Sequence, residues 1–177
     1  MIKFIRGSEA YYNEATRLLK TSKTFICLAK TPTAFLSSQR TKPWQFEFYD
    51  AFKDTIQNRD DIKIRYIFSL PLTKEELVKT AKLNKEQSLD DLNAWLVLSK
   101  DSRVDFSTIE YTAPFSFIIG DHETALLLIY PNGERACLVL SNKEVPYYLE
   151  YFNQLAEKSN KNNDKIISEI KKHIEEL

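Results

Sequence analysis

The apolar and polar positions in the first part of the chain switch between the period of a strand and the period of a helix. Three short apolar runs predict strands at residues 2–6, 23–30 and 62–68. Between them, helical spacing predicts a helix over 8–21 with Ser8 as its N-cap, and another over 43–59 with Pro43 in the first turn. This alternation is typical of an α/β sheet covered on both faces.

The second part of the chain is richer in strands. Four apolar runs predict strands at residues 104–111, 115–121, 124–130 and 135–141. A strong turn signal, Pro131-Asn132-Gly133, joins the last two into a hairpin. Three helices are also predicted, over residues 73–84, 88–100 and 143–158, the first two opened by capping patterns at Thr73 and Ser88. The expected fold is a single α-β-α sandwich with a mixed sheet.

A polar stretch at 159–163 separates the last predicted helix from the rest of the chain. This helix begins at Asp164 and carries a stripe of apolar residues at heptad spacing: Ile167, Ile170, Ile174 and Leu177. So short a helix needs a surface to pack on, and that surface could belong to its own domain or to a partner. We expect one domain over 1–158, followed by a polar linker and C-terminal helix over 159–177.

Composition narrows the classes of partner. Among 177 residues, Lys and Arg number 25 and Asp and Glu number 25, so no overall positive field draws the chain to nucleic acid or to an anionic membrane. Cys27 and Cys137 lie inside apolar strands, which predicts reduced core thiols rather than metal ligands or a disulfide. No apolar run approaches the ~18 residues of a membrane span. We expect a cytoplasmic protein.

The stretch from Pro114 to Asp121 is an apolar strand that ends on an acidic residue and leads into a second apolar run. It resembles the active-site hairpin of the phospholipase D-like superfamily, which reads His-x-Lys, four residues, then Asp. Counting back from Asp121 places Pro114 where the histidine belongs and Ser116 where the lysine belongs. The order of elements from residue 2 to 158 is also similar to the effector domain of archaeal TrmB-type transcriptional regulators.

The resemblance implies the fold of the superfamily, but the residues at the two reactive positions argue against its phosphodiesterase chemistry. Catalysis in the superfamily uses a histidine nucleophile, a second histidine as acid, and lysines that hold phosphate oxygens. Pro114 offers no nucleophile and Ser116 no fixed charge, while Leu128 and Ile129 are expected to fill the floor of the pocket. The two histidines, His122 and His173, are expected at a surface turn and on the tail helix. We therefore expect no phosphodiesterase or nuclease activity.

The superfamily places its site where the ends of strands converge, and a crevice there can bind a ligand without catalysis. The groups predicted to reach it are Thr33, Ser37, Ser38, Arg40, Ser69 and Ser116. Hydroxyls with one cation suit a sugar or a small phosphorylated metabolite, although a solvated polar loop would have the same composition. The acidic pairs Asp60–Asp61 and Asp90–Asp91 are placed at helix boundaries, where capping explains them better than a metal does. No metal or cofactor is expected.

Two functions from different classes follow. The first is a ligand-sensing or dimerisation module of the archaeal regulator type, and the second is a protein-interaction adaptor without a small-molecule ligand. In either case we expect a homodimer, with Ile167, Ile170, Ile174 and Leu177 as candidate contacts. The chain starts directly with a strand, so any DNA-reading module is expected to lie elsewhere.

Overall fold

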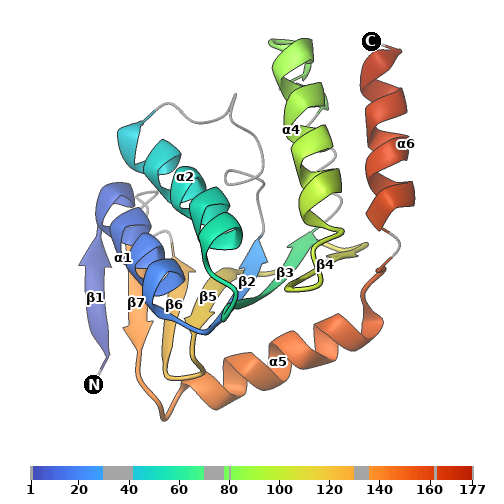
Figure 1. Ribbon diagram of the computed structural model, residues 1–177. Coiled ribbons are helices and arrows are strands. Elements are labelled where there is room, and N and C mark those ends of the chain that lie inside the picture. The colour runs from blue at the N-terminus through green and yellow to red at the C-terminus, as the bar shows by residue number, and fades with distance from the viewer. Residues whose placement is uncertain are drawn as a thin grey trace.

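The computed structural model describes residues 2–29, 42–69, 78–79, 81–129, 136–161 and 163–176 (Figure 1). Its centre is a seven-stranded sheet in the order β1-β7-β6-β5-β2-β3-β4. The strands are β1 (Lys3–Arg6), β2 (Thr24–Ala29), β3 (Lys63–Ser69), β4 (Val104–Ile109), β5 (Ser116–Gly120), β6 (Thr124–Ile129) and β7 (Ala136–Leu140). Every strand predicted from the sequence is confirmed.

The sheet has a parallel half and an antiparallel half. Strands β2, β3 and β4 pair in parallel, whereas β5, β6, β7 and β1 continue from β2 as antiparallel neighbours. The parallel strands are buried on both faces because helices cover both of them, as the near-continuous apolar runs predicted.

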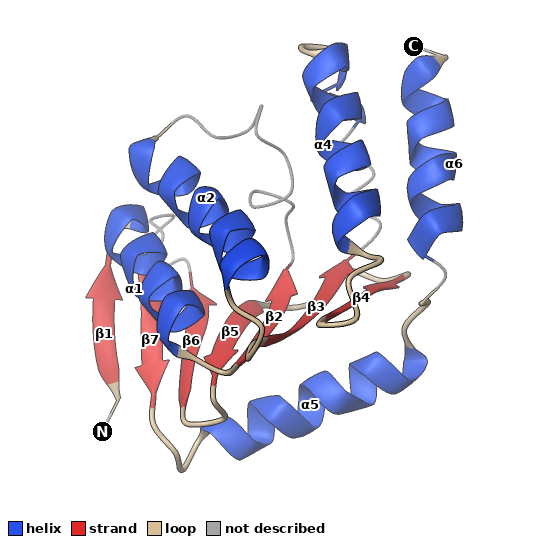
Figure 2. Ribbon diagram, in the orientation of Figure 1, coloured by secondary structure: helices blue, strands red, loops and turns tan. Residues whose placement is uncertain are grey.

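Five helices among the described residues cover the sheet: α1 (Ser8–Thr21), α2 (Pro43–Asn58), α4 (Lys85–Leu98), α5 (Val145–Lys158) and α6 (Asn163–Glu175). Helices α1, α2, α4 and α6 lie on one face, and α5 crosses the other face (Figure 2). The predicted α-β-α sandwich with a mixed sheet and a C-terminal helix is therefore confirmed. The turn at 131–133 and most of the helix predicted over 73–84 lie outside the described residues.

Two predicted N-caps are wrong, although the bounds predicted for α1 are correct. Gly7, not Ser8, is the N-cap of α1, and it adopts a φ of 90° that suits glycine. Helix α4 begins at Lys85, three residues before the predicted cap at Ser88, because the Asn84 side chain accepts a hydrogen bond from the Gln87 N–H. The acidic pair Asp90–Asp91 consequently lies inside α4 rather than at its boundary.

The two faces of the sheet hold separate cores. Under α1, α2, α4 and α6 the core is aromatic, and Trp95 of α4 packs there against four rings, those of Phe52, Tyr66, Phe68 and Phe106. Under α5 the core is mainly aliphatic, with Phe117 and Phe152 as its largest members. The larger core extends along the whole face, and its cluster of rings around Trp95 lies over the parallel half.

The C-terminal helix α6 packs on its own domain. Its side chains Ile167, Ile170 and Ile174 are all buried and belong to the aromatic core, beside α4. Of the two surfaces expected for this helix, the structure therefore shows its own domain, and in this arrangement the three side chains offer no surface to a partner. Leu177 lies outside the described residues.

Two arginines bind the carbonyl groups at the C-terminal ends of α1 and α2. Arg59 donates to the carbonyls of Leu19 and Lys20, which end α1. Arg103 donates to the carbonyls of Ile56 and Arg59, which end α2. These bonds satisfy carbonyls that have no partner within their own helix. They tie the end of α1 to the end of α2, and the end of α2 to the residue before β4.

The two outer edges of the sheet differ. At the β4 edge, Asn160 pairs with Thr108 through two backbone hydrogen bonds of 3.0 and 2.8 Å, so the segment between α5 and α6 covers part of this edge. At the β1 edge, no described residue pairs with the outer side of the strand. One edge is therefore partly covered by the chain itself and the other is open over the described residues.

Candidate functional site

The predicted hairpin is present and its two ends lie far apart. Strand β5 runs from Ser116 to Gly120 and turns through residues 121–123 into β6. Ser116 and Asp121 are five residues apart along an extended strand, or about 16 Å. Asp121 therefore lies at one end of the strands, and Ser116, in a reactive position of the superfamily motif, lies at the other end.

Asp121 has a structural role in this chain. Its carboxylate Oδ1 accepts hydrogen bonds from the N–H groups of Lys23 and Thr24, at 2.7 and 2.9 Å, and its own N–H donates to the Thr24 carbonyl. Its φ of 49° is one that aspartate tolerates better than most residues. Asp121 thus ties the β5–β6 turn to the start of β2.

Of the two residues in the reactive positions, Pro114 is exposed and Ser116 has an apolar neighbour on the next strand. Ser116 is half-buried and pairs across the sheet with Leu128, on the face covered by α1. Leu128 fills space beside Ser116, as predicted, whereas the next residue, Ile129, points to the other face because strand residues alternate. Only half of the predicted pocket floor is therefore on the Ser116 side.

Ser69 does not converge with Ser116. Ser69 ends β3 at the same end of the strands as Ser116. Its side chain lies on the α5 face, as that of Ile67 does, whereas Phe68 and Ser116 lie on the α1 face. Its hydroxyl is completely buried, donates to the Tyr111 carbonyl and accepts from the Ala113 N–H. The Ser69 side chain holds the segment after β4 in place. The other four predicted ligand residues, Thr33, Ser37, Ser38 and Arg40, lie outside the described residues.

The remaining reactive side chains lie where the sequence placed them. His122 is exposed in the β5–β6 turn and His173 is exposed on α6, far from each other along the fold. Cys27 and Cys137 are buried, and burial raises their pKa values to about 12 and about 11. Both thiols are therefore protonated at neutral pH and poor nucleophiles. The described residues contain no cluster of three potential metal ligands.

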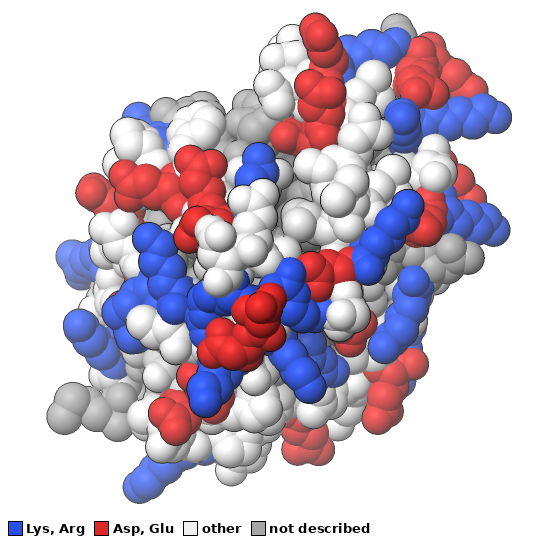
Figure 3. All heavy atoms as spheres, viewed as in Figure 1, with Lys and Arg blue, Asp and Glu red and all other residues white. Residues whose placement is uncertain are grey.

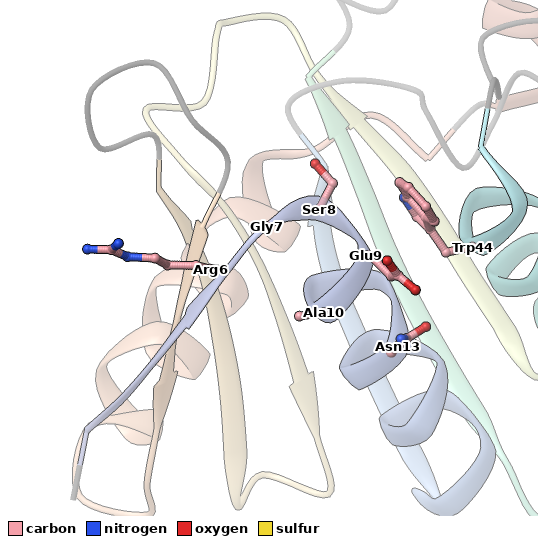
Figure 4. Close-up of a pocket in the computed structure, with 7 residues that line it drawn as sticks. All are labelled: Arg6, Gly7, Ser8, Glu9, Ala10, Asn13 and Trp44. Atoms are coloured by element: carbon pink, nitrogen blue, oxygen red, sulfur yellow. The ribbon is translucent and has the colours of Figure 1, made fainter.

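A shallow depression lies at the same end of the sheet as Ser116, where β1 turns into α1. It has a volume of about 500 Å³ and is lined by Arg6, Gly7, Ser8, Glu9, Ala10, Asn13 and Trp44. In Figure 4 the side chains of Ser8, Glu9, Asn13 and Trp44 lie between the starts of α1 and α2, while Arg6 points away from them. Two helix starts that are far apart in the sequence thus share one surface.

The lining offers hydrogen bonds of both kinds beside an aromatic surface. Ser8 and Asn13 can donate and accept, and Glu9 accepts. Gly7 has no side chain to cap the first-turn N–H groups of α1. The indole Nε1 of Trp44 is buried, and no acceptor among the described residues reaches it. Because Glu9 stands in the first turn, the depression suits a neutral, hydroxyl-bearing ligand better than an anion.

Sequence reasoning missed these residues. Trp44, Phe48 and Tyr49 all fall in the helix predicted over 43–59. Phe48 and Tyr49 are buried in the core, whereas Trp44 is half-buried and lines the depression. The available signal was the pair of helix starts, Gly7-Ser8 and Pro43-Trp44, but only the tertiary fold brings them together.

The surface carries mixed charges. Figure 3 shows basic and acidic side chains interspersed over the face formed by α1, α2, α4 and α6, in keeping with a formal net charge of zero. This face has no broad positive field. Among the described residues, no helix is long and apolar enough to cross a membrane.

The fold is that of an α/β protein with a seven-stranded mixed open sheet. Among solved structures, the chain is similar to TrmBL2, described as an archaeal chromatin protein with a novel mode of DNA binding. The TM-score is 0.56 at 11% identity, over 90% of this chain and 54% of the other. The chain therefore spans about half the length of that structure. The likeness supports the predicted resemblance to archaeal TrmB-type proteins at the level of fold.

No family model matches the sequence, and no curated protein matches it. Descent from the phospholipase D-like superfamily stays a prediction that rests on the hairpin and on the order of the elements.

Proposed function

We propose that this chain is a non-catalytic ligand-binding module of the archaeal regulator type, and that its ligand is a neutral, hydroxyl-rich molecule such as a sugar. The depression between the starts of α1 and α2 carries the proposal, because it combines an indole surface with hydroxyl, amide and carboxylate groups. Sugars present both apolar faces and hydroxyls, so they can use both kinds of contact.

The residues in the reactive positions support binding without turnover. Ser116 lies against Leu128, and neither histidine is near it in the fold. A nucleophile, an acid and a cationic clamp would all have to come from elsewhere. We expect no hydrolysis of phosphodiesters or nucleic acids; activity lost in a His122→Ala variant would contradict this part of the proposal.

Thermal unfolding with a panel of ligands tests the binding proposal. The panel holds neutral mono- and disaccharides, phosphorylated sugars and nucleotides. A ligand at 100 times its dissociation constant should add about 2.7 kcal/mol to the free energy of unfolding. We expect the neutral sugars to give the largest shift. A flat response to the whole panel would contradict the proposal and favour the alternative function, a protein-interaction adaptor.

Isothermal calorimetry with a responding sugar then locates the site. Trp44→Ala and Asn13→Ala remove the indole surface and one hydrogen-bonding group, and each should weaken binding at least about tenfold. The matched control is Phe46→Ala, since Phe46 is 43% exposed in the same helical turn but does not line the depression. Equal losses from Trp44→Ala and Phe46→Ala would place the site elsewhere.

A further inference from the structure

The open edge of the sheet carries apolar side chains that the domain does not cover. On β1, Phe4 is 44% exposed, and Ile2 just before the strand is 57% exposed. Both lie on the α5 face of the sheet, but α5 packs mainly against the strands from β6 to β4, and these two side chains at the outer strand remain exposed (Figure 1). Phe4 pairs with Leu138, which pairs in turn with Leu127, and both leucines are half-buried. An apolar row therefore runs up to the open edge.

The charged residues of β1 do not shield this edge. The guanidinium of Arg6 lies over the Phe4 ring of its own chain, 5.7 Å from the centroid. Lys3 lies on the α1 face together with Ile5, because strand residues alternate. Charges that project from the edge itself discourage pairing, whereas Lys3 lies on one face of β1 and Arg6 on the other.

We propose that a second copy of this chain pairs with the open edge, β1 against β1 in antiparallel orientation, so that the two sheets form one continuous sheet. The occupant follows from the sequence of the strand. A two-fold axis perpendicular to the sheet keeps each face of the two sheets on the same side. Directly opposed residues share a face, so the axis must pass midway between the two copies of one residue. The residue at the centre fixes every opposing pair.

Only one centre uses the whole strand without opposing like charges. An axis at Lys3 would set Lys3 against its own copy, which is unfavourable. An axis at Ile5 would pair Lys3 with Gly7, whose φ of 90° is outside the strand. An axis at Phe4 pairs Phe4 with Phe4, Ile2 with Arg6 and Lys3 with Ile5. The two aromatic rings meet, and the apolar row continues from one copy into the other.

Disulfide trapping tests the register, because both natural cysteines are buried. In the proposed pairing the Cβ atoms of the two copies of residue 4 are about 5 Å apart, so Phe4→Cys should cross-link under a mild oxidant such as copper–phenanthroline. Ile2→Cys is the matched control: its two copies are separated by four residues, or about 14 Å, and should not cross-link. Cross-linking of Ile2→Cys but not of Phe4→Cys would overturn the register.

Light scattering and sedimentation test the pairing itself. The unaltered chain should have the mass of a dimer at about 200 µM, and Phe4→Lys, which opposes two ammonium groups, should weaken the dimer at least about tenfold. Val97→Lys is the control, since Val97 is 71% exposed on α4, away from the edge. A monomeric mass for the unaltered chain, or a dimer insensitive to Phe4→Lys in a folded variant, would overturn the proposal. Neither readout depends on ligand binding.

Discussion

The parallel and antiparallel halves of the sheet differ in how fully they are enclosed. Strands β2, β3 and β4 are covered on both faces, carry the aromatic core around Trp95, and end at an edge partly covered by Asn160. Strands β5, β6, β7 and β1 carry smaller side chains and end at an edge that no described residue covers. The burial of large rings favours a greater contribution to stability from the parallel half, whereas exposed apolar side chains of β1 lie at the end of the antiparallel half.

The largest expected effect tests where the stability lies. Trp95→Ala should lower the free energy of unfolding by about 3–5 kcal/mol, because a 1% exposed indole packed against four rings would leave a cavity. Chemical denaturation measures it. The control is Val97→Ala on the same helix, with an expected change within about 0.5 kcal/mol. Similar losses in both variants would contradict the conclusion that the aromatic core around Trp95 makes a large contribution to stability.

Gly120 joins the two halves and should come next. A Cβ atom there would lie 2.5 Å from Ser22 Oγ and 3.0 Å from Leu18 Cδ2, so Gly120→Ala must displace these side chains or the end of α1 that carries them. We expect a loss of about 1–3 kcal/mol in denaturation experiments. Adding Ser22→Ala to the same chain removes the closer atom and should recover part of the loss. No recovery would mean that the contact with Leu18 dominates.

Substitutions of Asp121 test how much the β5–β6 hairpin contributes to the free energy of unfolding. Asp121→Ala removes the acceptor of two backbone hydrogen bonds and places alanine at a φ of 49°, which should cost about 1–2 kcal/mol. Asp121→Asn keeps an oxygen acceptor and tolerates the same φ, so its stability should lie closer to that of the unaltered chain. If both variants lose the same amount, the charge of Asp121 matters more than its geometry.

The smallest effect concerns acid, at the end of the parallel half. Hydrogen bonds from Arg103 lower the pKa of Asp101 from its ordinary 3.8 to about 2. A lowered pKa means that the stabilisation is complete above about pH 4 and is lost as the pH falls toward 2. Because the pair is partly exposed, it should contribute about 1 kcal/mol or less. Denaturation midpoints from pH 5 to 2 should fall less steeply in Asp101→Asn.

The sequence predicted the strands better than the helix starts or the site. Apolar runs located all seven strands, because a buried strand needs little beyond a local apolar pattern. The start of α4 was missed because Ser88, a residue type that often caps helices, donates instead to the Asn84 carbonyl within the helix.

The candidate site was only partly predictable for a different reason. Ser69 has a hydroxyl at the expected edge, yet backbone groups from the segment after β4 occupy it. The depression brings Asn13 and Trp44 together from helices that are separate in the sequence, and that proximity depends on how α1 packs against α2. Local patterns report which residues are polar, but not which of them meet.

The pairing of Asn160 with Thr108 limits how large an assembly can become. A protein with two free sheet edges can add copies head to tail without end, and such heterologous contacts build filaments. Here Asn160 occupies one position of the β4 edge and would hinder the addition of a further strand there, so the isologous pairing proposed for β1 would close after two copies. The short bridge at residue 160 would thus act as a terminator of polymerisation.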